Sequence, residues 1–436
     1  MEMKVNVKWN VNMNRSEMNG NGLQRIVCLA VVPMVAAWLL LAACGSSRRA
    51  VRPEVVQVPR VTTPTQVVPV AKPKTKEPTA EERLAVRLDS LLTARDSLLQ
   101  TSQLGLHVVD LTTGVVLYAR GERQRMRPAS TEKVVTAVAA LDALGPSYTL
   151  DTRLMATGEV NGGVLKGDLY VRGAMDPLLT QADVRALAAQ LKEAGVQRVA
   201  GRIVADASMK DGDDYGWGWC WDDKNAVLSP LLCGGKPGLA GELKAALGRA
   251  GVKVGAVVAG VTPAGARELV VLRRPLAEVL QPMMKESDNL CAECVFYQLG
   301  RTRKEVAARM QGLLGEGSST VADGSGLSLY NYQTPETFTR LLGYAAARPD
   351  SIFQPLLAAL PIAGVDGTLK NRMQGTAAEV AVRAKTGTVT AVSTLVGYTT
   401  QRSTNHLLAF AIMNQGVKSG AQGRALQDEV CRVISE

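Results

Sequence analysis

Three short polar motifs stand far apart along this chain of 436 residues, and they can share one site only in a fold that brings all three together. They are Ser-Thr-Glu-Lys at 130–133, Ser-Asp-Asn at 287–289 and Lys-Thr-Gly at 385–387. A second Ser-x-Asn, at 403–405, follows the Lys-Thr-Gly and breaks the order. In their order the three motifs indicate a serine nucleophile that a lysine activates for acyl transfer.

The first motif has a simple geometric basis. Residues 134–144 are predicted to form a buried helix, which places Ser130 at the helix N-terminus and Lys133 one turn later. A lysine accepts a proton only when neutral, and burial beside a second cation, here Lys385, is expected to lower its pKa. Alone, the motif would more often be a serine cap followed by a solvated lysine. The other two motifs favour the catalytic interpretation.

Longer segments accompany the motifs and narrow the interpretation. They are Gly-Ala-Met-Asp-Pro at 173–177, Ser-Asp-Asn-Leu-Cys-Ala-Glu at 287–293, Asp-Gly-Ser-Gly-Leu-Ser at 323–328 and Gly-Val-Asp-Gly-Thr-Leu at 364–369. With them, residues 84 to 436 resemble the S13 peptidase family, the D-alanyl-D-alanine carboxypeptidases/endopeptidases of the penicillin-binding protein 4 type.

The resemblance implies an α/β (α+β) fold. Its core is expected to be a transpeptidase domain like that of penicillin-binding proteins and β-lactamases, an antiparallel sheet with helices on both faces, split by a smaller, inserted β-rich domain. We assign residues 83–148 and 274–436 to the catalytic DD-peptidase domain. Residues 149–273, where short strands alternate with glycine-rich turns, are assigned to the insertion.

The resemblance also implies catalytic roles. Ser130 is the expected nucleophile and Lys133 its base. Ser287 is expected to relay a proton to the leaving amine, and Asn289 to bond both Lys133 and the substrate amide. Asp288 is interpreted as a brace for its loop.

Substrate contacts are expected along the third motif. Lys385 and Thr386 would bind the terminal carboxylate of a D-Ala-D-Ala stem peptide, and Gly387 would let the substrate backbone lie flat against its strand. The backbone N–H groups of Ser130 and Thr388 would form the oxyanion hole.

Two further positions bear on specificity. Asp176 matches a family aspartate near the amino-bearing side chain of the peptide, although an Asp-Pro turn is nearly as good an interpretation. Relatives often have arginine after Ser-Gly-Leu-Ser, whereas this chain has Leu329, which weakens the case for a carboxylate on the third stem residue.

The N-terminal region predicts export. An apolar stretch over 26–43 follows Arg25 and ends in Leu-Ala-Ala-Cys, which is typical of a lipoprotein signal peptide over 1–43 with lipidation of Cys44. An uncleaved membrane anchor is the alternative. Residues 44–82 are rich in proline, lysine and threonine and read as an extended tether. We therefore expect a cell-envelope protein, anchored to the membrane by lipid and facing the periplasm.

Charge and residue usage narrow the remaining classes. Of the net charge of +10, residues 1–43 contribute +2 and residues 45–80 contribute +5, so the basic charge lies mainly outside the folded part and no nucleic-acid partner is expected. With two histidines, neither a histidine-based metal site nor a Ser-His-Asp triad is expected, and no cofactor is implied. A disulfide between Cys220 and Cys233 is possible, whereas Cys291 and Cys294 are expected to pack in a core.

These observations predict a serine-type D-Ala-D-Ala carboxypeptidase/endopeptidase that acts on peptidoglycan stem peptides and is inhibited by β-lactams. Two alternatives stay open. A serine β-lactamase would use the same residues, but no Glu-x-x-Leu-Asn segment for water activation follows the second motif. A non-catalytic peptidoglycan-binding lipoprotein would keep the fold alone.

Overall fold

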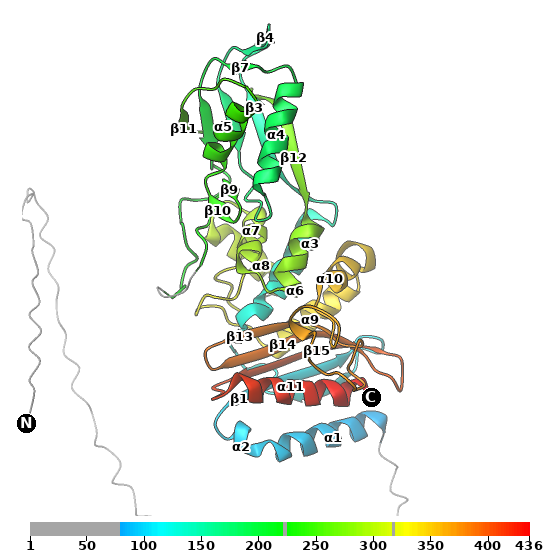
Figure 1. The fold of residues 1–436 in the computed structure, drawn as a ribbon. Coiled ribbons are helices and arrows are strands. Elements are labelled where there is room, and N and C mark those ends of the chain that lie inside the picture. The colour runs from blue at the N-terminus through cyan, green and yellow to red at the C-terminus, as the bar shows by residue number, and fades with distance from the viewer. Residues whose placement is uncertain (1–78, 221–224, 316–318) are drawn as a thin grey trace, which may run out of the picture. The chain divides into compact units, whose positions relative to one another are not determined.

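The computed structural model describes residues 79–436 except 221–224 and 316–318 (Figure 1). The predicted signal peptide 1–43, Cys44 and nearly all of the predicted tether 44–82 lie outside the described residues. Among the helices that are described, none is both long and apolar enough to span a bilayer.

The central element is a five-stranded antiparallel sheet in the order β13-β14-β15-β1-β2. Strands β14 and β15 are buried along almost their whole length, although only β15 is nearly continuous in apolar residues, and β14 also carries serine and threonine side chains. The sheet consists of β1 (Gln103–Asp110), β2 (Val116–Arg120), β13 (Arg383–Val389), β14 (Val392–Thr400) and β15 (Leu407–Gln415).

Helices cover both faces of this sheet. One face packs against α1 (Ala80–Ala94) and α11 (Gly420–Ser435), and the other against α9 (Pro335–Ala346) and the helices beyond it (Figure 1). Helix α1 begins at Ala80, because Thr79 and Glu82 form a capping box before it, and a break at Arg95 separates it from α2 (Asp96–Leu99). Helix α1 therefore begins before residue 83, at which the catalytic domain was predicted to start.

A group of helices forms the second layer. Within it α3 is buried all round at its first ten residues, as expected of a helix that lies inside a core. The group consists of α3 (Glu132–Leu144), α6 (Leu276–Lys285), α7 (Asn289–Phe296), α8 (Arg303–Leu314) and α10 (Gln354–Ala359).

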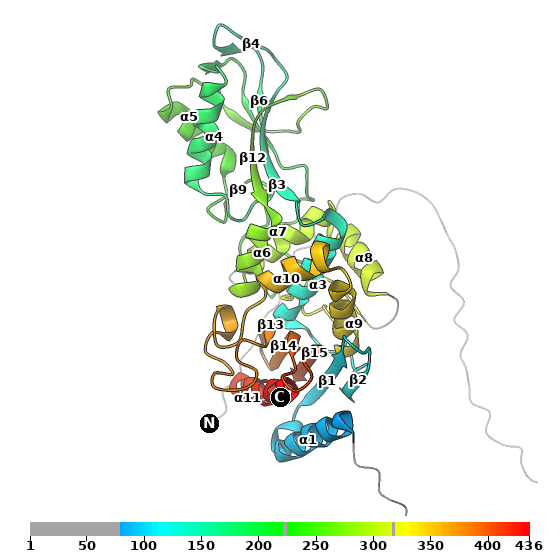
Figure 2. The ribbon, with the colours of Figure 1, turned by 90° about the vertical axis from the view of Figure 1, so that its right-hand side faces the viewer.

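The chain leaves this layer and returns to it through two paired strands. β3 (Thr149–Ala156) and β12 (Arg267–Pro275) are antiparallel neighbours, with Thr149 opposite Pro275 (Figure 2). They belong to a second five-stranded sheet in the order β11-β8-β6-β3-β12. The other strands of that sheet are β6 (Leu169–Arg172), β8 (Ile203–Asp206) and β11 (Val257–Ala259).

This inserted region also holds two helices that the β-rich prediction missed, α4 (Gln181–Glu193) and α5 (Leu239–Arg249). Both pack their apolar faces into the core beside the second sheet. A short three-stranded sheet and one strand pair complete the region. The sheet consists of β4 (Val160–Asn161), β5 (Val164–Leu165) and β7 (Arg198–Val199), and the pair of β9 (Leu232–Cys233) and β10 (Lys236–Pro237).

The cysteines behave mainly as core residues. Cys291 and Cys294 are buried on α7, which confirms the packing interpretation of their spacing. Cys233 carries a free thiol, so the possible disulfide with Cys220 is not formed.

Candidate active site

The fold brings the three motifs together around two lysine amines. Ser130 lies in the 3₁₀ turn Ala129–Thr131 that leads into α3, and the Nζ of Lys133 lies 3.0 Å from its Oγ. Lys385, on β13, donates a hydrogen bond of 2.9 Å to the Oγ of Ser287. Each serine of the first two motifs is therefore paired with a lysine.

Lys133 is fully buried, and its amine donates three hydrogen bonds to three different acceptors. These are Ser130 Oγ at 3.0 Å, Asn289 Oδ1 at 2.7 Å and the backbone oxygen of Ser325 at 2.8 Å. Burial lowers the pKa of Lys133 to about 8, and nearby carboxylates, that of Asp323 first, oppose the shift. An appreciable fraction of this amine is therefore neutral near pH 7 to 8 and able to accept the Ser130 proton.

Lys385 is the more strongly perturbed lysine. Its amine is fully buried and donates to Ser287 Oγ and, at 2.7 Å, to the backbone oxygen of Thr386. Burial, followed by the charge of Lys133, holds the pKa of Lys385 well below its usual range. The expected lysine–lysine repulsion therefore lowers the pKa of Lys385, whereas the pKa of Lys133 is lowered by burial and not, as predicted, by the charge of Lys385.

The second motif is held in a constrained loop between α6 and α7. Ser287 has a φ of 61°, a left-handed conformation that costs a residue with a side chain about 1–3 kcal/mol. Asp288 caps α7 by accepting the N–H of Cys291 at 2.8 Å, and its own N–H donates to Pro282 O at 3.1 Å. These bonds match the bracing role expected of Asp288 and aim Ser287 and Asn289 at the two lysines.

A salt bridge holds the neighbouring glycine-rich loop against this motif. Lys285, at the end of α6, lies 2.6 Å from the carboxylate of Asp366, and it also donates to Leu360 O at 2.6 Å. The hydroxyl of Thr368, in the same loop, accepts a hydrogen bond of 2.9 Å from Thr386. The Gly-Val-Asp-Gly-Thr-Leu segment thus links the second motif to the third.

Gly387 is required for a different reason from the one predicted. A Cβ at this position would collide with the Thr394 hydroxyl and would lie 2.7 Å from the carbonyl oxygen of Pro128. It would therefore point into the protein, toward the turn that carries Ser130, and not toward a substrate on the strand edge. The glycine allows β13 to pack directly against the nucleophile turn.

Strand β13 forms the outer edge of the sheet. Its beginning is covered, since Ala384 donates to Pro361 O at 3.0 Å and Ala363 donates to Val382 O at 3.0 Å. From Thr386 to Val389 no further strand pairs with this edge in the part of the chain that the structure describes. Thr388 is exposed there. This open edge can accept an extended peptide by strand addition.

The Asp-Gly-Ser-Gly-Leu-Ser segment forms the floor beside Lys133. Asp323 accepts the N–H of Gly326 at 2.8 Å, the N–H of Ser328 at 2.6 Å and the indole N–H of Trp219 at 2.8 Å. This network holds the Ser325 carbonyl toward Lys133. Asp323 therefore shapes this loop. Ser325 contributes a backbone acceptor, which no residue-type motif would have identified.

Among the described residues, no hydrogen bond or ion pair joins Asp176 to Lys133 or Lys385. Its carboxylate is buried, lies 3.3 Å from the guanidinium of Arg274 and accepts the N–H of Leu178 at 2.9 Å. Burial raises the pKa of Asp176. This geometry fits a capped Asp-Pro turn, and contact between Asp176 and a substrate stays a prediction.

The chain is similar to known D-Ala-D-Ala carboxypeptidases over most of its length. A model of the D-Ala-D-Ala carboxypeptidase 3 (S13) family matches residues 84–231 and 238–436. A D-alanyl-D-alanine carboxypeptidase of Actinomadura sp. (strain R39) is 30% identical, over 80% of this chain and 84% of the relative. A carboxypeptidase DacB of Mycolicibacterium smegmatis is 32% identical, over 94% of this chain and 96% of the relative.

A solved structure confirms the predicted fold class. The crystal structure of penicillin-binding protein 4 from Haemophilus influenzae superposes with a TM-score of 0.71 at 24% identity, covering 79% of this chain and 99% of that one. The likeness includes the transpeptidase fold with its inserted sheet.

Proposed function

The chain belongs to the D-Ala-D-Ala carboxypeptidase 3 (S13) family, and from this premise we propose that it cleaves D-Ala-D-Ala peptides through an acyl-enzyme on Ser130. It is a serine D-Ala-D-Ala carboxypeptidase by family. The observation that carries the assignment of residues is the Lys133 amine, 3.0 Å from Ser130 Oγ and with its pKa lowered to about 8. Few environments other than a nucleophile site pair a buried amine with a serine hydroxyl in this way.

The proposed reaction begins when neutral Lys133 takes the hydroxyl proton of Ser130. The Oγ then attacks the carbonyl carbon between the two D-alanines, and the negative charge on oxygen is stabilised by the N–H groups of Ser130 and Thr388. Ser287 passes a proton to the leaving amine, so the C–N bond breaks and D-alanine departs. Water then attacks the ester carbonyl and gives a proton to neutral Lys133, the bond from that carbon to Ser130 Oγ breaks, Lys133 passes the proton to Oγ, and the shortened peptide leaves.

Substrate binding is proposed to follow the open edge of β13. Asn289 would bond the substrate amide while it holds Lys133. Lys385 and Thr386 would bind the terminal carboxylate. Because Lys385 has a strongly lowered pKa when no anion is present, an arriving carboxylate would raise that pKa and favour the charged amine. Binding of substrate is then expected to be linked to uptake of a proton.

We propose that the enzyme works in the cell envelope, as a lipoprotein anchored through Cys44 and facing the periplasm. The support is the apolar segment 26–43 with its Leu-Ala-Ala-Cys end, followed by the proline-rich stretch 44–82. The proposed partners are peptidoglycan stem peptides as substrates and β-lactams as inhibitors.

The test is mass spectrometry of the full-length protein incubated with benzylpenicillin, beside a Ser130→Ala variant. A stable one-to-one adduct mapped to Ser130 and missing from the variant is the expected result. Rapid hydrolysis of the penicillin would favour a β-lactamase. Neither an adduct nor hydrolysis would favour a wall-binding protein without catalysis.

A further inference from the structure

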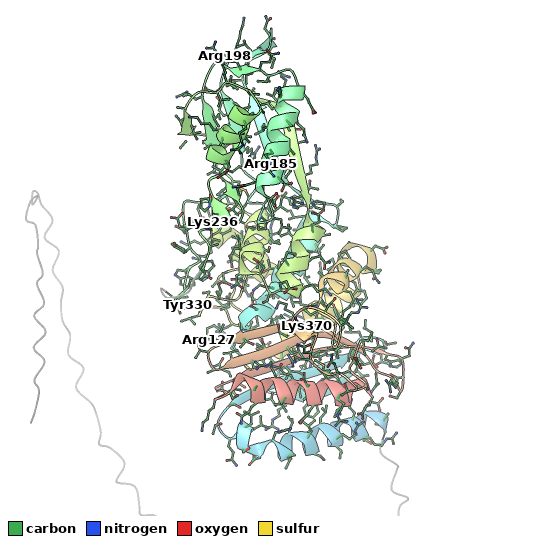
Figure 3. All side chains as sticks on the ribbon, viewed as in Figure 1. Arg127, Arg185, Arg198, Lys236, Tyr330 and Lys370 are labelled. Carbon is green, nitrogen blue, oxygen red and sulfur yellow. The ribbon has the colours of Figure 1, made fainter. Side chains whose placement is uncertain are left out.

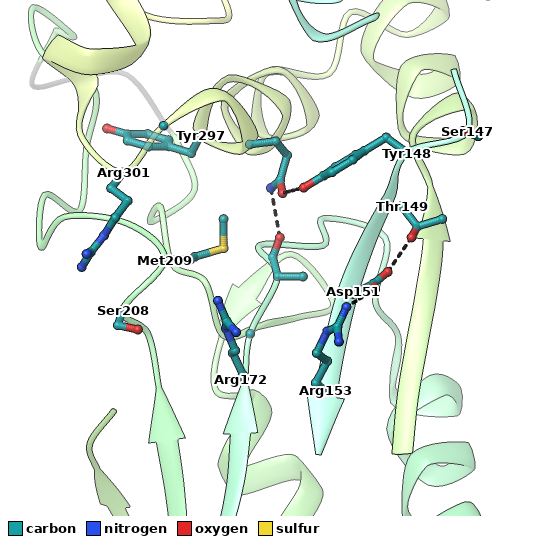
Figure 4. Close-up of a pocket in the computed structure, with 14 residues that line it drawn as sticks. Ser147, Tyr148, Thr149, Asp151, Arg153, Arg172, Ser208, Met209, Tyr297 and Arg301 are labelled. Atoms are coloured by element: carbon teal, nitrogen blue, oxygen red, sulfur yellow. Dashed lines mark hydrogen bonds and ion pairs between the residues drawn. The ribbon is translucent and has the colours of Figure 1, made fainter. Parts of the chain in front are cut away.

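A polar cavity of about 810 Å³ lies where the inserted sheet meets the segment that follows α7 (Figure 4). Ser147 and Tyr148, which line it, follow the C-terminal end of α3, whereas Ser130 precedes the N-terminal end. Since a helix rises about 1.5 Å per residue, the cavity lies roughly 20 Å from the Ser130 hydroxyl. None of the residues 130–133, 287–289 and 385–387 lines it, although Gly173 and Ala174 do. It is therefore a separate site, and its volume is typical of pockets that hold small ligands.

The sheet topology explains why the pocket forms here. Strands β6 and β8 are parallel neighbours, and their carboxyl ends are Arg172 and Asp206. The segments that follow these ends, with Gly173 after β6 and Met209 after β8, form one wall. Loops at the carboxyl ends of adjacent parallel strands commonly diverge and leave room for a ligand.

The cavity carries more positive charge than it neutralises. Arg153 is satisfied, because its guanidinium lies 2.6 Å from both Asp151 and Glu268. Arg172, directly opposite Arg153 on β6, and Arg301, on the far wall, have no ion pair or side-chain hydrogen bond among the described residues. Figure 4 shows Arg172 rising into the space between Met209 and Arg153, with Arg301 on the other side of Met209.

Like charges directly opposite on neighbouring strands destabilise a sheet. Arg153 and Arg172 are such a pair, but Asp151 and Glu268 already offset the charge of Arg153, so only the charge of Arg172 is left without a carboxylate. Guanidinium groups bind carboxylates and phosphates with paired hydrogen bonds. An acidic ligand in the cavity would supply the carboxylate or phosphate oxygens that Arg172 and Arg301 lack.

The opposite wall is preorganised and polar. The hydroxyl of Tyr148 donates to Gln298 Oε1 at 3.0 Å, and the Gln298 amide donates to Ala174 O at 3.1 Å. These bonds tie together the segment before β3, the segment after β6 and the 3₁₀ turn Tyr297–Leu299 that follows α7, so the distance across the cavity is held by the fold. Ser147 and Ser208 add hydroxyls to the lining.

We propose that this cavity binds an acidic ligand through Arg172 and Arg301. The ligand class is a carboxylate- or phosphate-bearing molecule or polymer segment. Carboxylates of a peptide and phosphates of a polymer or lipid headgroup share this chemistry. The proposal does not depend on acyl transfer at Ser130, because it concerns binding at a different place.

The test is isothermal titration calorimetry of the full-length protein in detergent with two probes, tricarballylate as a tricarboxylate and pyrophosphate. The double variant Arg172→Gln/Arg301→Gln is compared with Arg198→Gln, a matched change at an exposed arginine on β7, away from the cavity (Figure 3). Losing charge-assisted bonds is expected to weaken binding by about tenfold to a hundredfold in the double variant and to leave Arg198→Gln unchanged.

The two probes separate the sources. Binding of tricarballylate alone would support a peptide carboxylate as the ligand, and binding of pyrophosphate alone would support a phosphate. Binding of both would support an anion site that does not distinguish the two. Equal affinity in the double variant would overturn the proposal, since the anion would then bind elsewhere, for example at Lys385. No binding of either probe to the wild-type protein at about 1 mM would overturn it as well. Thermal unfolding of each variant checks that the fold is kept.

Discussion

Glu293 accepts the backbone N–H of Ser325 at 2.8 Å, while the carbonyl of the same Ser325 accepts a hydrogen bond from Lys133 at 2.8 Å. A buried carboxylate on α7 thereby positions one of the three acceptors that hold the base. The same Glu293 oxygen accepts the N–H of Gly324 at 3.1 Å. Burial, followed by the charge of Asp323, raises the pKa of Glu293 to about 8. Glu293 is therefore a positioning residue that keeps a proton at neutral pH.

Removing this side chain should impair acylation without touching the nucleophile. Glu293→Ala leaves two buried N–H groups without an acceptor, which we expect to cost about 1–3 kcal/mol in the free energy of unfolding for each. Acylation by benzylpenicillin should slow by about tenfold or more as Ser325 drifts from Lys133. Glu293→Gln, whose amide oxygen can still accept both bonds, should recover most of the rate. A glutamine variant as slow as the alanine variant would contradict a positioning role.

The raised pKa of Glu293 also predicts a pH dependence of stability. Between the ordinary carboxyl value of 4.5 and about 8, the folded protein keeps this proton and the unfolded chain has lost it. Folding is therefore favoured at the acid end, and this contribution to stability is lost as pH rises. Glu293→Gln removes it, so the variant should gain stability relative to the wild type from pH 5 to pH 8. Urea unfolding at both pH values measures this, and a constant difference would contradict the assignment.

The lowered pKa of Lys133 predicts how acylation depends on pH. Because only the neutral amine can take the Ser130 proton, the acylation rate should rise about tenfold per pH unit below 8 and level off above it. Lys133→Ala should slow acylation by about 10²–10⁴-fold. Stopped-flow measurement with a fluorescent penicillin checks both. Lys236→Ala, at an exposed lysine of the inserted region, is the control (Figure 3), and a rate independent of pH between 6 and 9 would argue against Lys133 as the base.

Packing between β13 and the nucleophile turn predicts the effect of filling Gly387. Gly387→Ala places a methyl group against Thr394 and Pro128, so it should cost about 1–3 kcal/mol in stability and push the oxyanion-hole strand away from Ser130. Acylation should fall by about 10²-fold or more. Gly312→Ala, in α8 with open space around it, should be neutral or stabilising by up to about 1 kcal/mol. Normal acylation by Gly387→Ala would show that the contact can relax.

The sequence predicted which residues form the site more accurately than it predicted why each residue is needed. Order and spacing identified Ser130, Lys133, Ser287 and Lys385, and the structure brings all four together. The explanation for Gly387 was wrong, because the direction of a Cβ from a strand depends on which face packs against its neighbours. A pattern of residue types does not contain that information when the neighbour is a turn more than 250 residues away.

Two other gaps have physical causes. The role of Ser325 rests on a backbone oxygen, which every residue carries, and the role of Glu293 depends on that oxygen. Helix α4 was missed although Thr180 and Asp183 form a capping box before apolar residues at helical spacing, a signal that was present in the sequence. Glycine-rich turns on both sides favoured the interpretation of that region as strands alone.

Leu329 provides a test of substrate preference by gain of function. Its side chain is 37% exposed, and its N–H donates to Gly218 O at 3.2 Å, so the backbone is held while the side chain is free to change. The resemblance to the S13 family predicts an arginine at this position, where this chain has leucine. Leu329→Arg should raise kcat/KM about tenfold for stem peptides with a carboxylate on the third residue, because a guanidinium can pair with it. Peptides without that carboxylate should be cleaved at the wild-type rate, and Leu329→Gln, polar but uncharged, should change neither. Equal gains on both peptides would show that the arginine acts on the loop and not on the substrate, and Leu329 would then have no part in choosing the stem peptide.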